Sequence, residues 1–360
     1  MIKIKKITRD RDIINGSKDL EYLYTFKEFP VFMGCTNQNI KKDIFFDMQW
    51  KISKSSGVIQ LDPLLPLSVL YPESHGSGNI GSLWLEHHQR FSKFIQKQNP
   101  KSVLEIGGLH GILSREYMKQ NPIDWKIIEP NPSPGIGVKA KFIKGFFDEK
   151  FTLNYEIDTI IHSHVFEHIY NPNEFISQIS NFLKNDQKLI FSVPNMEEML
   201  KKKYTNCLNF EHTIFLTEPY INYLLEKYGF KLIDKEYFKK DHSIFYTYHK
   251  FKKINTIAFS DILYEHNKKI FLDFVEYHKL IVDEINKKIY NTPSTKKIYL
   301  FGAHIFSQYL FIFGLNANKI TCLLDNDPDK HDKRLYGSNL RVDSPNIIKD
   351  IKNPIVILKA

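Results

Sequence analysis

The stretch VLEIGGLHG, from Val103 to Gly111, decides how the centre of the chain folds. It begins as a short apolar strand that carries Glu105 and ends in a glycine-rich turn before a helix. Its glycines are Gly107, Gly108 and Gly111. Glycines in such a turn let the backbone bend tightly and let a ligand approach the main chain. The dinucleotide fingerprint G-x-G-x-x-G is not met, because Leu109 stands at its middle glycine. The pattern alone predicts either a plain strand-to-helix turn or a site for a nucleotide-type ligand.

Strands and helices alternate around this stretch. Five short apolar runs are typical of buried strands: SVLEIGG, WKIIEPNP, KFIKGFF, IDTIIHSHV and QKLIFSVPN. Amphipathic helices are expected at GSLWLEHHQRFSKFIQKQ, GILSREYMKQ, NEFISQISNFLKN and EPYINYLLEKYGF. Two more extended segments, KLIDKEYF and HSIFYTYHKF, complete the unit. This alternation predicts an α/β fold with a mainly parallel sheet that has helices on both faces.

The flanking segments predict two smaller units. Residues 1–72 form an N-terminal lobe of short extended pieces, and residues 73–250 form the central domain. A long helical pattern over 258–290 opens the C-terminal part, residues 251–360. There KKIYLFGAHIFSQYLFIFGL and ITCLLDNDP repeat the order strand, glycine turn, helix and strand, which predicts a second, smaller Rossmann-like α/β domain.

Composition narrows the class of protein. Three scattered cysteines form neither a disulfide framework nor a metal pair, which favours a cytoplasmic location. No apolar run is long enough for a transmembrane helix, and the basic N-terminus lacks the apolar core of a signal peptide. The net charge is +9, but only six of the 50 basic residues are arginine and they are not clustered. We therefore expect no nucleic-acid partner and no membrane insertion.

Two further positions suit a nucleoside ligand. Glu129 ends the second strand, 18 residues after Gly111, and a carboxylate there can accept hydrogen bonds from both hydroxyls of a ribose. The alternative is a solvated loop glutamate. Phe146 and Phe147 follow the third strand in KGFFDE, where they either line an adenine pocket or belong to the core.

The fourth strand runs into IDTIIHSHVFEHIYNP. This segment resembles the D-x-[apolar]3…E-H-[IL]-x-[DN]-P element of class I S-adenosylmethionine (SAM)-dependent methyltransferases, and the first glycine turn resembles their motif I, acidic-x-G-x-x-x-G. The matching positions of the second element are Asp158, Phe166, Glu167, His168, Ile169 and Pro172. The resemblance implies a Rossmann-like central domain, with SAM as cofactor and S-adenosylhomocysteine as product.

The same resemblance implies the cofactor contacts. They are expected from Glu105, Gly107, Gly108, Gly111, Glu129, Phe146, Phe147, His162 and Ser163. Glu105 would lie near the methionine end of the cofactor. His162 and Ser163, with His164, would flank the sulfonium. His168 would be structural, beneath the site.

Methyl transfer to a hydroxyl also needs a group that removes the acceptor's proton, and histidine suits that task at neutral pH. His164 ends the fourth strand, where it can be the base or a substrate contact. His212 follows Glu211 in LNFEHTIFL, and the carboxylate can orient the imidazole. The alternative for this second site is a surface Glu–His pair. The predicted catalytic residues are therefore His212, Glu211 and His164.

Nearly the whole chain resembles the three-domain methyltransferases that act on nucleotide-linked deoxysugars for surface polysaccharides. The shared motifs are, in order, GVIQLDPLLPLSVLY, SHGSG, VLEIGG, FEHTIFLT and YLFGAH…LLDNDP…VDSP. The resemblance implies substrate contacts at Tyr71, His75, Asn209, Gly302 and His304. The glycine turn at Gly302 precedes a helix N-terminus, which suits the pyrophosphate of a nucleotide-sugar. An independent NAD site is not expected, because GAH lacks the fingerprint.

Two departures from that family change the expectations. Its N-terminal zinc ribbon uses two C-x-x-C pairs, but the corresponding residues here are Asp12, Asn15, Ser53 and Ser56. These ligands should not hold zinc, so we predict a lobe without metal, held by aromatic packing. The aromatic residues are Tyr22, Tyr24, Phe26, Phe32 and Trp50.

The second departure is Asn209, which stands where the C-methylating members have tyrosine. An amide cannot replace a phenol in acid–base work. The residues therefore favour O-methylation of a nucleotide-linked hexose or heptose for capsule or lipopolysaccharide. C-methylation of a keto-deoxysugar and a catalytically silent SAM- or nucleotide-sugar-binding subunit remain alternatives. A nucleic-acid methyltransferase is disfavoured, because the chain has no [DN]-P-P-[FYW] motif.

Overall fold

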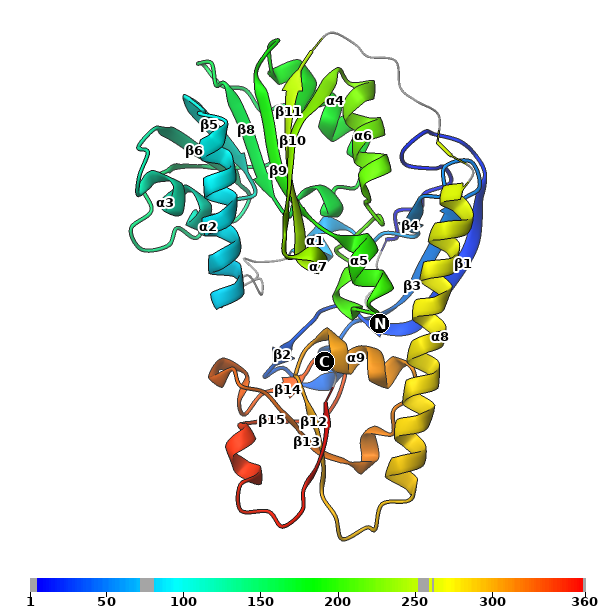
Figure 1. Cartoon of the computed structure of the whole chain (residues 1–360). Coiled ribbons are helices and arrows are strands. Elements are labelled where there is room, and N and C mark those ends of the chain that lie inside the picture. The colour runs from blue at the N-terminus through cyan, green and yellow to red at the C-terminus, as the bar shows by residue number, and fades with distance from the viewer. Residues whose placement is uncertain (1–4, 72–80, 252–258, 261, 359–360) are drawn as a thin grey trace.

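The computed structural model describes residues 5–71, 81–251, 259–260 and 262–358. The central sheet, with helices on both faces, lies at one end of the molecule, and a smaller sheet lies at the other (Figure 1). The N-terminal sheet and a long helix run between them. The predicted substrate residue His75, with the rest of SHGSG, lies outside the described residues. No helix in the described ranges has the length and apolar character needed to cross a membrane.

The central sheet has seven strands in the order β10-β11-β9-β8-β5-β6-β7. Their bounds are β5 Ser102–Ile106, β6 Asp124–Glu129, β7 Lys141–Lys144, β8 Thr159–Ser163, β9 Lys188–Pro194, β10 Phe230–Phe238 and β11 Ser243–Lys250. Strands β7, β6, β5, β8 and β9 are parallel, and β11 is antiparallel to both β9 and β10. The predicted α/β fold with a parallel-rich sheet is confirmed. The chain leaves β5 toward one edge and returns at β8 toward the other, which makes their carboxyl ends a topological switch point.

Helices cover the two faces because apolar residues alternate along the strands. Val103, Ile127 and Ile161 share one buried cluster with α2 (Ser82–Lys97) and α3 (Ile112–Met118). Their neighbours Leu104 and Ile160 belong to a second cluster with α4 (Pro172–Phe182) and α6 (Glu218–Lys227). Figure 1 shows the two helix layers on opposite sides of the sheet. Both faces of the parallel strands are therefore dry, and a ligand must bind at a strand end.

The N-terminal sheet has the order β1-β3-β4, with β1 Leu20–Pro30, β3 Phe45–Ser53 and β4 Ile59–Leu61. β1 is an 11-residue strand, longer than the short pieces that the sequence predicted. Phe26 and Trp50 are buried as expected, but Tyr22 is 62% exposed and lies outside the buried core of the lobe. The short helices α1 (Leu67–Leu70), α5 (Met196–Lys201) and α7 (Lys239–His242) are connecting segments.

The C-terminal part begins with α8 (Ile262–Tyr290), which runs along the molecule (Figure 1). A parallel sheet follows in the order β15-β13-β12-β16, with β12 Ile298–Phe301, β13 Ile320–Leu324, β15 Val342–Asp343 and β16 Ile355–Leu358. Helix α9 (Ile305–Ile312) packs against β1, and β14 (Arg334–Leu335) pairs with β2 (Cys35–Thr36). Segments from the two ends of the chain thus share contacts. The division into three domains at 72 and 250 stays a prediction.

The residues aligned with zinc ligands do come together in the N-terminal lobe. Ser56 Oγ donates to Asp12 Oδ2 (2.5 Å), and the Ser56 amide donates to Ser53 Oγ (3.3 Å). Asp12 also accepts from the amide of Asn15 (3.2 Å). Direct hydrogen bonds thus join these positions. That this lobe needs no metal stays a prediction.

Candidate functional site

The glycine turn after β5 leaves no room for side chains. Gly107 has φ +76° and Gly111 has φ +67°, values that favour glycine. A Cβ on Gly107 would lie 2.7 Å from Val165 Cγ2, and one on Gly108 would lie 2.8 Å from Glu105 Oε1. The turn is therefore packed closely against both β5 and the segment after β8.

Glu105 lies directly beneath this turn. Its carboxyl is buried and accepts a hydrogen bond from Trp125 Nε1 (2.8 Å). Burial raises the pKa of Glu105 to about 7, although the Trp125 hydrogen bond opposes the shift. A buried carboxyl of this kind is easily ionised by a ligand cation, such as an amino group, that comes close to it.

Glu129 ends β6 and faces the same turn. Its Oε2 accepts from the Leu109 amide (3.3 Å) and its Oε1 accepts from the Asn131 amide (3.0 Å). A carboxylate oxygen can accept more than one hydrogen bond, so ribose hydroxyls remain possible donors here. Glu105 and Glu129 thus stand on two sides of a turn at the switch point, which fits the methionine and ribose ends of SAM.

Two of the other predicted cofactor residues do not face this site. His162 is fully buried, stacked on Phe191 (ring centroids 4.8 Å apart) and next to Phe175 of α4. Burial lowers the pKa of His162 to about 3. The prediction that His162 flanks the sulfonium is wrong, because strand alternation turns it into the α4 face. Phe147 packs on Phe175 and neighbouring rings, so it belongs to the core, which was the alternative to an adenine pocket. Phe146 is 59% exposed. Ser163, the last residue of β8, is partly buried.

His164 follows β8 in a strained conformation, with φ +54°. Its amide donates to the Ser192 carbonyl of β9 (2.8 Å), and its ring spans two partners. Nδ1 lies 3.2 Å from Glu167 Oε1, and Nε2 lies 3.0 Å from Ser243 Oγ. The strain therefore places an imidazole between the end of β8 and a buried carboxylate.

Glu167 was part of the sequence motif but was given no role there. Its side chain is fully buried among His164, His168 and His212. Burial alone would raise the pKa of Glu167, but His164 and the other two imidazoles lower it to about 2. This negative charge beneath the site is the feature that sequence reasoning missed. The FEH motif, which recurs as FEH at Phe210, was its only signal.

The loop before α6 brings Glu211 and His212 to the same place. His212 Nδ1 lies 2.9 Å from the Cys207 carbonyl, so this nitrogen carries the proton and Nε2 has a free lone pair. The His168 and His212 rings meet edge to face at 5.0 Å. His168 Nδ1 lies 3.9 Å from Glu211 Oε2 and 3.3 Å from the Tyr71 hydroxyl. Burial and Glu211 raise the pKa of Tyr71, which keeps its proton.

Asn209 has a different role from the predicted substrate contact. Its Oδ1 accepts from the amides of Glu211 (2.8 Å) and His212 (3.0 Å), and its Nδ2 donates to the Asn206 carbonyl. The side chain is buried and its hydrogen-bonding groups are used. The prediction is corrected: Asn209 shapes the turn that presents the Glu–His pair.

More histidines surround the site than the sequence suggested. Trp84 and His87 of α2 lie against His164, with ring centroids 4.9 and 5.3 Å away, and His242 follows at 6.2 Å. Burial lowers the pKa of His242 to about 4. These rings form a neutral aromatic wall on the α2 side of His164. Their positions in distant segments gave no sequence signal.

Gly302 and His304 lie in the C-terminal part, in the turn between β12 and α9. The Ala303 amide of that turn donates to Asp325 Oδ2 (2.9 Å), which also pairs with Lys330 (3.0 Å). An internal carboxylate thus uses the amide that an anion would need. Burial lowers the pKa of His304 to about 4, so its ring is neutral at pH 7. The pyrophosphate role of this turn stays a prediction.

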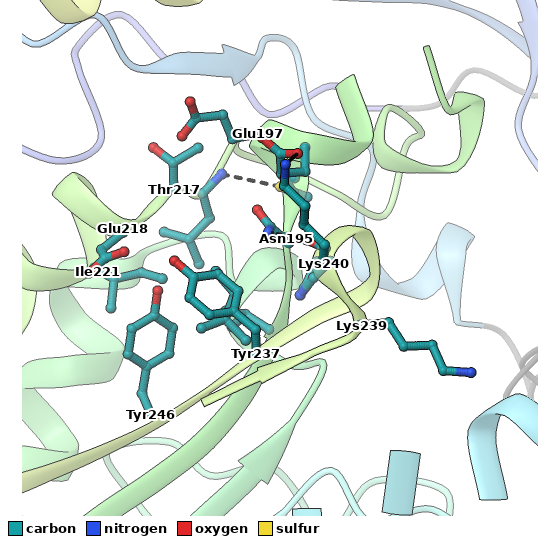
Figure 2. A pocket seen from close by; sticks show the side chains of 15 residues that line it. Asn195, Glu197, Thr217, Glu218, Ile221, Tyr237, Lys239, Lys240 and Tyr246 are labelled. Atoms are coloured by element: carbon teal, nitrogen blue, oxygen red, sulfur yellow. Dashed lines mark hydrogen bonds and ion pairs between the residues drawn. The ribbon is translucent and has the colours of Figure 1, made fainter. Parts of the chain in front are cut away.

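A separate cavity of about 460 Å³ is lined in part by Val193 and Pro194, the last two residues of β9. Figure 2 shows side chains from α5, α6, α7 and the β10–β11 pair around it, including Tyr237, Tyr246 and Thr217. None of the predicted cofactor or catalytic residues lines it. We therefore place the candidate site at the carboxyl ends of β5, β6 and β8, on the topology and the residues gathered there.

Residues 79–235 match the family described as "Methyltransferase domain". This segment contains the glycine turn, Glu105 and Glu129, and the three imidazoles around Glu167, which are His164, His168 and His212. The chain carries a SAM-dependent methyltransferase domain. SAM is the cofactor of this enzyme, and the glycine turn between Glu105 and Glu129 fits it.

Several solved structures are similar to this chain in part. An O-methyltransferase family protein from Burkholderia thailandensis shares 10% identity over 47% of this chain, with a TM-score of 0.38, and the chain spans 57% of that protein. The N-methyltransferase NodS from Bradyrhizobium japonicum WM9 shares 12% over 48% of this chain and 99% of its own (TM-score 0.36). The mitomycin 7-O-methyltransferase MmcR shares 16% over 51% and 62% (TM-score 0.41). No curated protein matches the sequence.

Proposed function

We propose that the enzyme O-methylates a sugar, namely a nucleotide-linked hexose or heptose destined for capsule or lipopolysaccharide. The observation that carries the proposal is the meeting of Glu211 and His212 with Tyr71 and His168, beside the strand ends that hold the cofactor. The order of motifs along the chain supports a sugar as acceptor. A cytoplasmic location, where nucleotide-sugars and SAM are available, goes with this proposal.

In this proposal, one group of residues binds the cofactor and another removes the proton of the acceptor hydroxyl. The glycine turn, Glu105 and Glu129 hold SAM, which supplies an electrophilic methyl group on sulfur. His212 is held by the Cys207 carbonyl at Nδ1, so its Nε2 can accept the proton of a hydroxyl. His164 is the second candidate base, with Glu167 3.2 Å from its Nδ1. Aligned reactants and a placed base are what displacement at a methyl group requires.

O-methylation is favoured over C-methylation by the chemistry at Asn209. Its amide is bound to backbone groups and offers no acid or base. The nearby phenol, Tyr71, keeps its proton because burial and Glu211 raise its pKa. The phenol that assists proton removal from carbon in the C-methylating members is therefore missing at position 209, whereas a hydroxyl needs only a proton acceptor during transfer.

The test is mass spectrometry of SAM reactions with GDP-, UDP- and dTDP-sugars. We expect one sugar class to gain a methyl group on oxygen, and His212→Ala to lower kcat/KM by about 100-fold or more, the usual contribution of a general base. His164→Ala is measured beside it, and His266→Ala, a partly buried site on α8 that pairs with Glu197, is the control. Full activity in both site variants would exclude these bases. Deuterium uptake at a sugar carbon without SAM would favour C-methylation instead, and SAM binding without turnover would favour a silent subunit.

A further inference from the structure

Three potential metal ligands converge beside the proposed acceptor site. Glu167, His168 and His212 each have a ligand atom within 4.8 Å of the others. They come from two separate segments, the turn after β8 and the loop before α6. The Glu167 Oε1 and His168 Nε2 atoms are 3.8 Å apart, too far for a hydrogen bond. This separation suits two atoms that bind one cation at about 2.1 Å each.

Glu167 has the property expected of an anionic metal ligand. Its side chain is 0% exposed, and Oε2 accepts no hydrogen bond from any residue in the described ranges. A buried carboxylate oxygen without a partner is costly. His164 contacts the other oxygen, Oε1, at 3.2 Å and fixes the orientation of the group. A cation bound at Oε1, the oxygen 3.8 Å from His168 Nε2, would balance the negative charge of this buried carboxylate.

Both histidines are held in the manner of metal ligands. Imidazoles that bind metals usually donate the second ring N–H to a carbonyl or a carboxylate, which fixes the tautomer. His212 Nδ1 lies 2.9 Å from the Cys207 carbonyl. His168 Nδ1 lies 3.3 Å from the Tyr71 hydroxyl and 3.9 Å from Glu211 Oε2. In His212 the Cys207 carbonyl therefore leaves Nε2 for a cation. His168 also interacts with the Glu211 main chain, and its Nε2 lies 3.8 Å from Glu167 Oε1.

We infer that Glu167, His168 and His212 hold one divalent transition-metal cation. Two imidazoles and one carboxylate favour Zn²⁺, Mn²⁺ or Fe²⁺ over Mg²⁺ and Ca²⁺, which prefer oxygen ligands. The side chains of His168 and Glu211 are 25% and 24% exposed, which opens the site to solvent on that side. The sequence named no metal ligand in any part of the chain, and this inference adds a site in the central domain.

The cation's role rests on the proposed function. It would bind the acceptor hydroxyl, orient it and lower its pKa. His212 would then serve as a ligand, and the neighbouring Glu211 carboxylate would accept the hydroxyl proton. Three protein ligands leave coordination positions for the substrate, as in catalytic rather than structural metal sites.

The site is tested on the untagged full-length chain, stripped with a chelator and titrated with Co²⁺ as a spectroscopic probe. We expect one equivalent to bind with visible d–d absorption, and Zn²⁺ to displace it. His168→Ala and His212→Ala should each weaken Co²⁺ binding by at least about 100-fold, and Glu211→Gln by about 10-fold or more. His266→Ala is the matched control, and the unfolding midpoint of each variant checks its fold.

The outcomes separate this inference from the proposed function. No stoichiometric Co²⁺ binding by the wild-type chain, or wild-type affinity in folded His168→Ala and His212→Ala, overturns the metal site. Stoichiometric binding with no methylation of any sugar keeps the site and overturns the proposed substrate class. Full sugar methylation in the chelated enzyme, with no Co²⁺ bound, keeps the function and restores His212 as the base.

Discussion

At the scale of single residues, Glu105 makes the stability of the folded protein depend on pH. Burial raises its pKa from 4.5 to about 7 in the folded protein. The folded state therefore holds a proton that the unfolded chain has released between these values. The contribution of this proton to the free energy of unfolding is fully present below pH 4.5, and it is lost as the pH rises through 7.

Glu105→Gln mimics the protonated form and keeps an acceptor for Trp125. We expect the variant and the wild type to differ little in unfolding free energy at pH 5, and the variant to be the more stable at pH 8. Denaturant unfolding of the ligand-free protein at both pH values measures this difference. Parallel pH profiles for the two proteins would show that Glu105 does not titrate in this range.

Residue roles were the hardest part to predict from sequence. Glu105 and Glu129 lie near the ends of β5 and β6 beside the glycine turn, as the sequence predicted, and their contacts with the cofactor stay predictions. His162 was misplaced because period-2 alternation, and not closeness to the strand end, decides which face a side chain takes. Asn209 was misread because an asparagine side chain can bind either a substrate or nearby backbone amides. The sequence does not show which backbone amides lie within its reach.

At the scale of elements, the β5–turn–α3 unit is the most constrained part of the site. The missing Cβ of Gly108 leaves space for the Glu105 carboxyl and for Ile127 Cγ2, both less than 3 Å from where it would lie. Gly108→Ala should therefore push the turn outward, destabilise the fold by about 1–3 kcal/mol and weaken SAM binding by 10-fold or more. Calorimetry with SAM and thermal unfolding measure the two effects. Unchanged SAM affinity would mean that the turn does not contact the cofactor.

Element types and order were predictable in the central sheet because each strand is a short apolar run and each helix is amphipathic. The group of rings around His164 was not predictable, since its members come from α2, the segment after β8 and the end of α7. Only strand order brings these segments together. A local pattern contains no information on which distant segment will be the neighbour.

At the scale of the whole molecule, the C-terminal part supports the loop that carries Glu211 and His212. Tyr309 of α9 is fully buried and donates a hydrogen bond to the Leu208 carbonyl (2.7 Å). The adjacent Cys207 carbonyl holds His212 Nδ1. The same tyrosine packs edge to face on Phe26 of β1 (5.2 Å). One side chain therefore joins three parts of the molecule to the loop that presents Glu211 and His212.

Tyr309→Phe tests this coupling. The substitution keeps the ring but leaves the Leu208 carbonyl without its partner in a dry environment, which should cost about 1–3 kcal/mol of unfolding free energy. Because the loop that carries His212 is loosened, kcat for methyl transfer should fall more than SAM affinity, since Glu105 and Glu129 are untouched. Denaturant unfolding, calorimetry with SAM and turnover on the identified sugar give the three values, with Tyr290→Phe, 88% exposed, as control. Equal loss of SAM binding and turnover would point to general destabilisation and would contradict a specific link from α9 to the loop that carries His212.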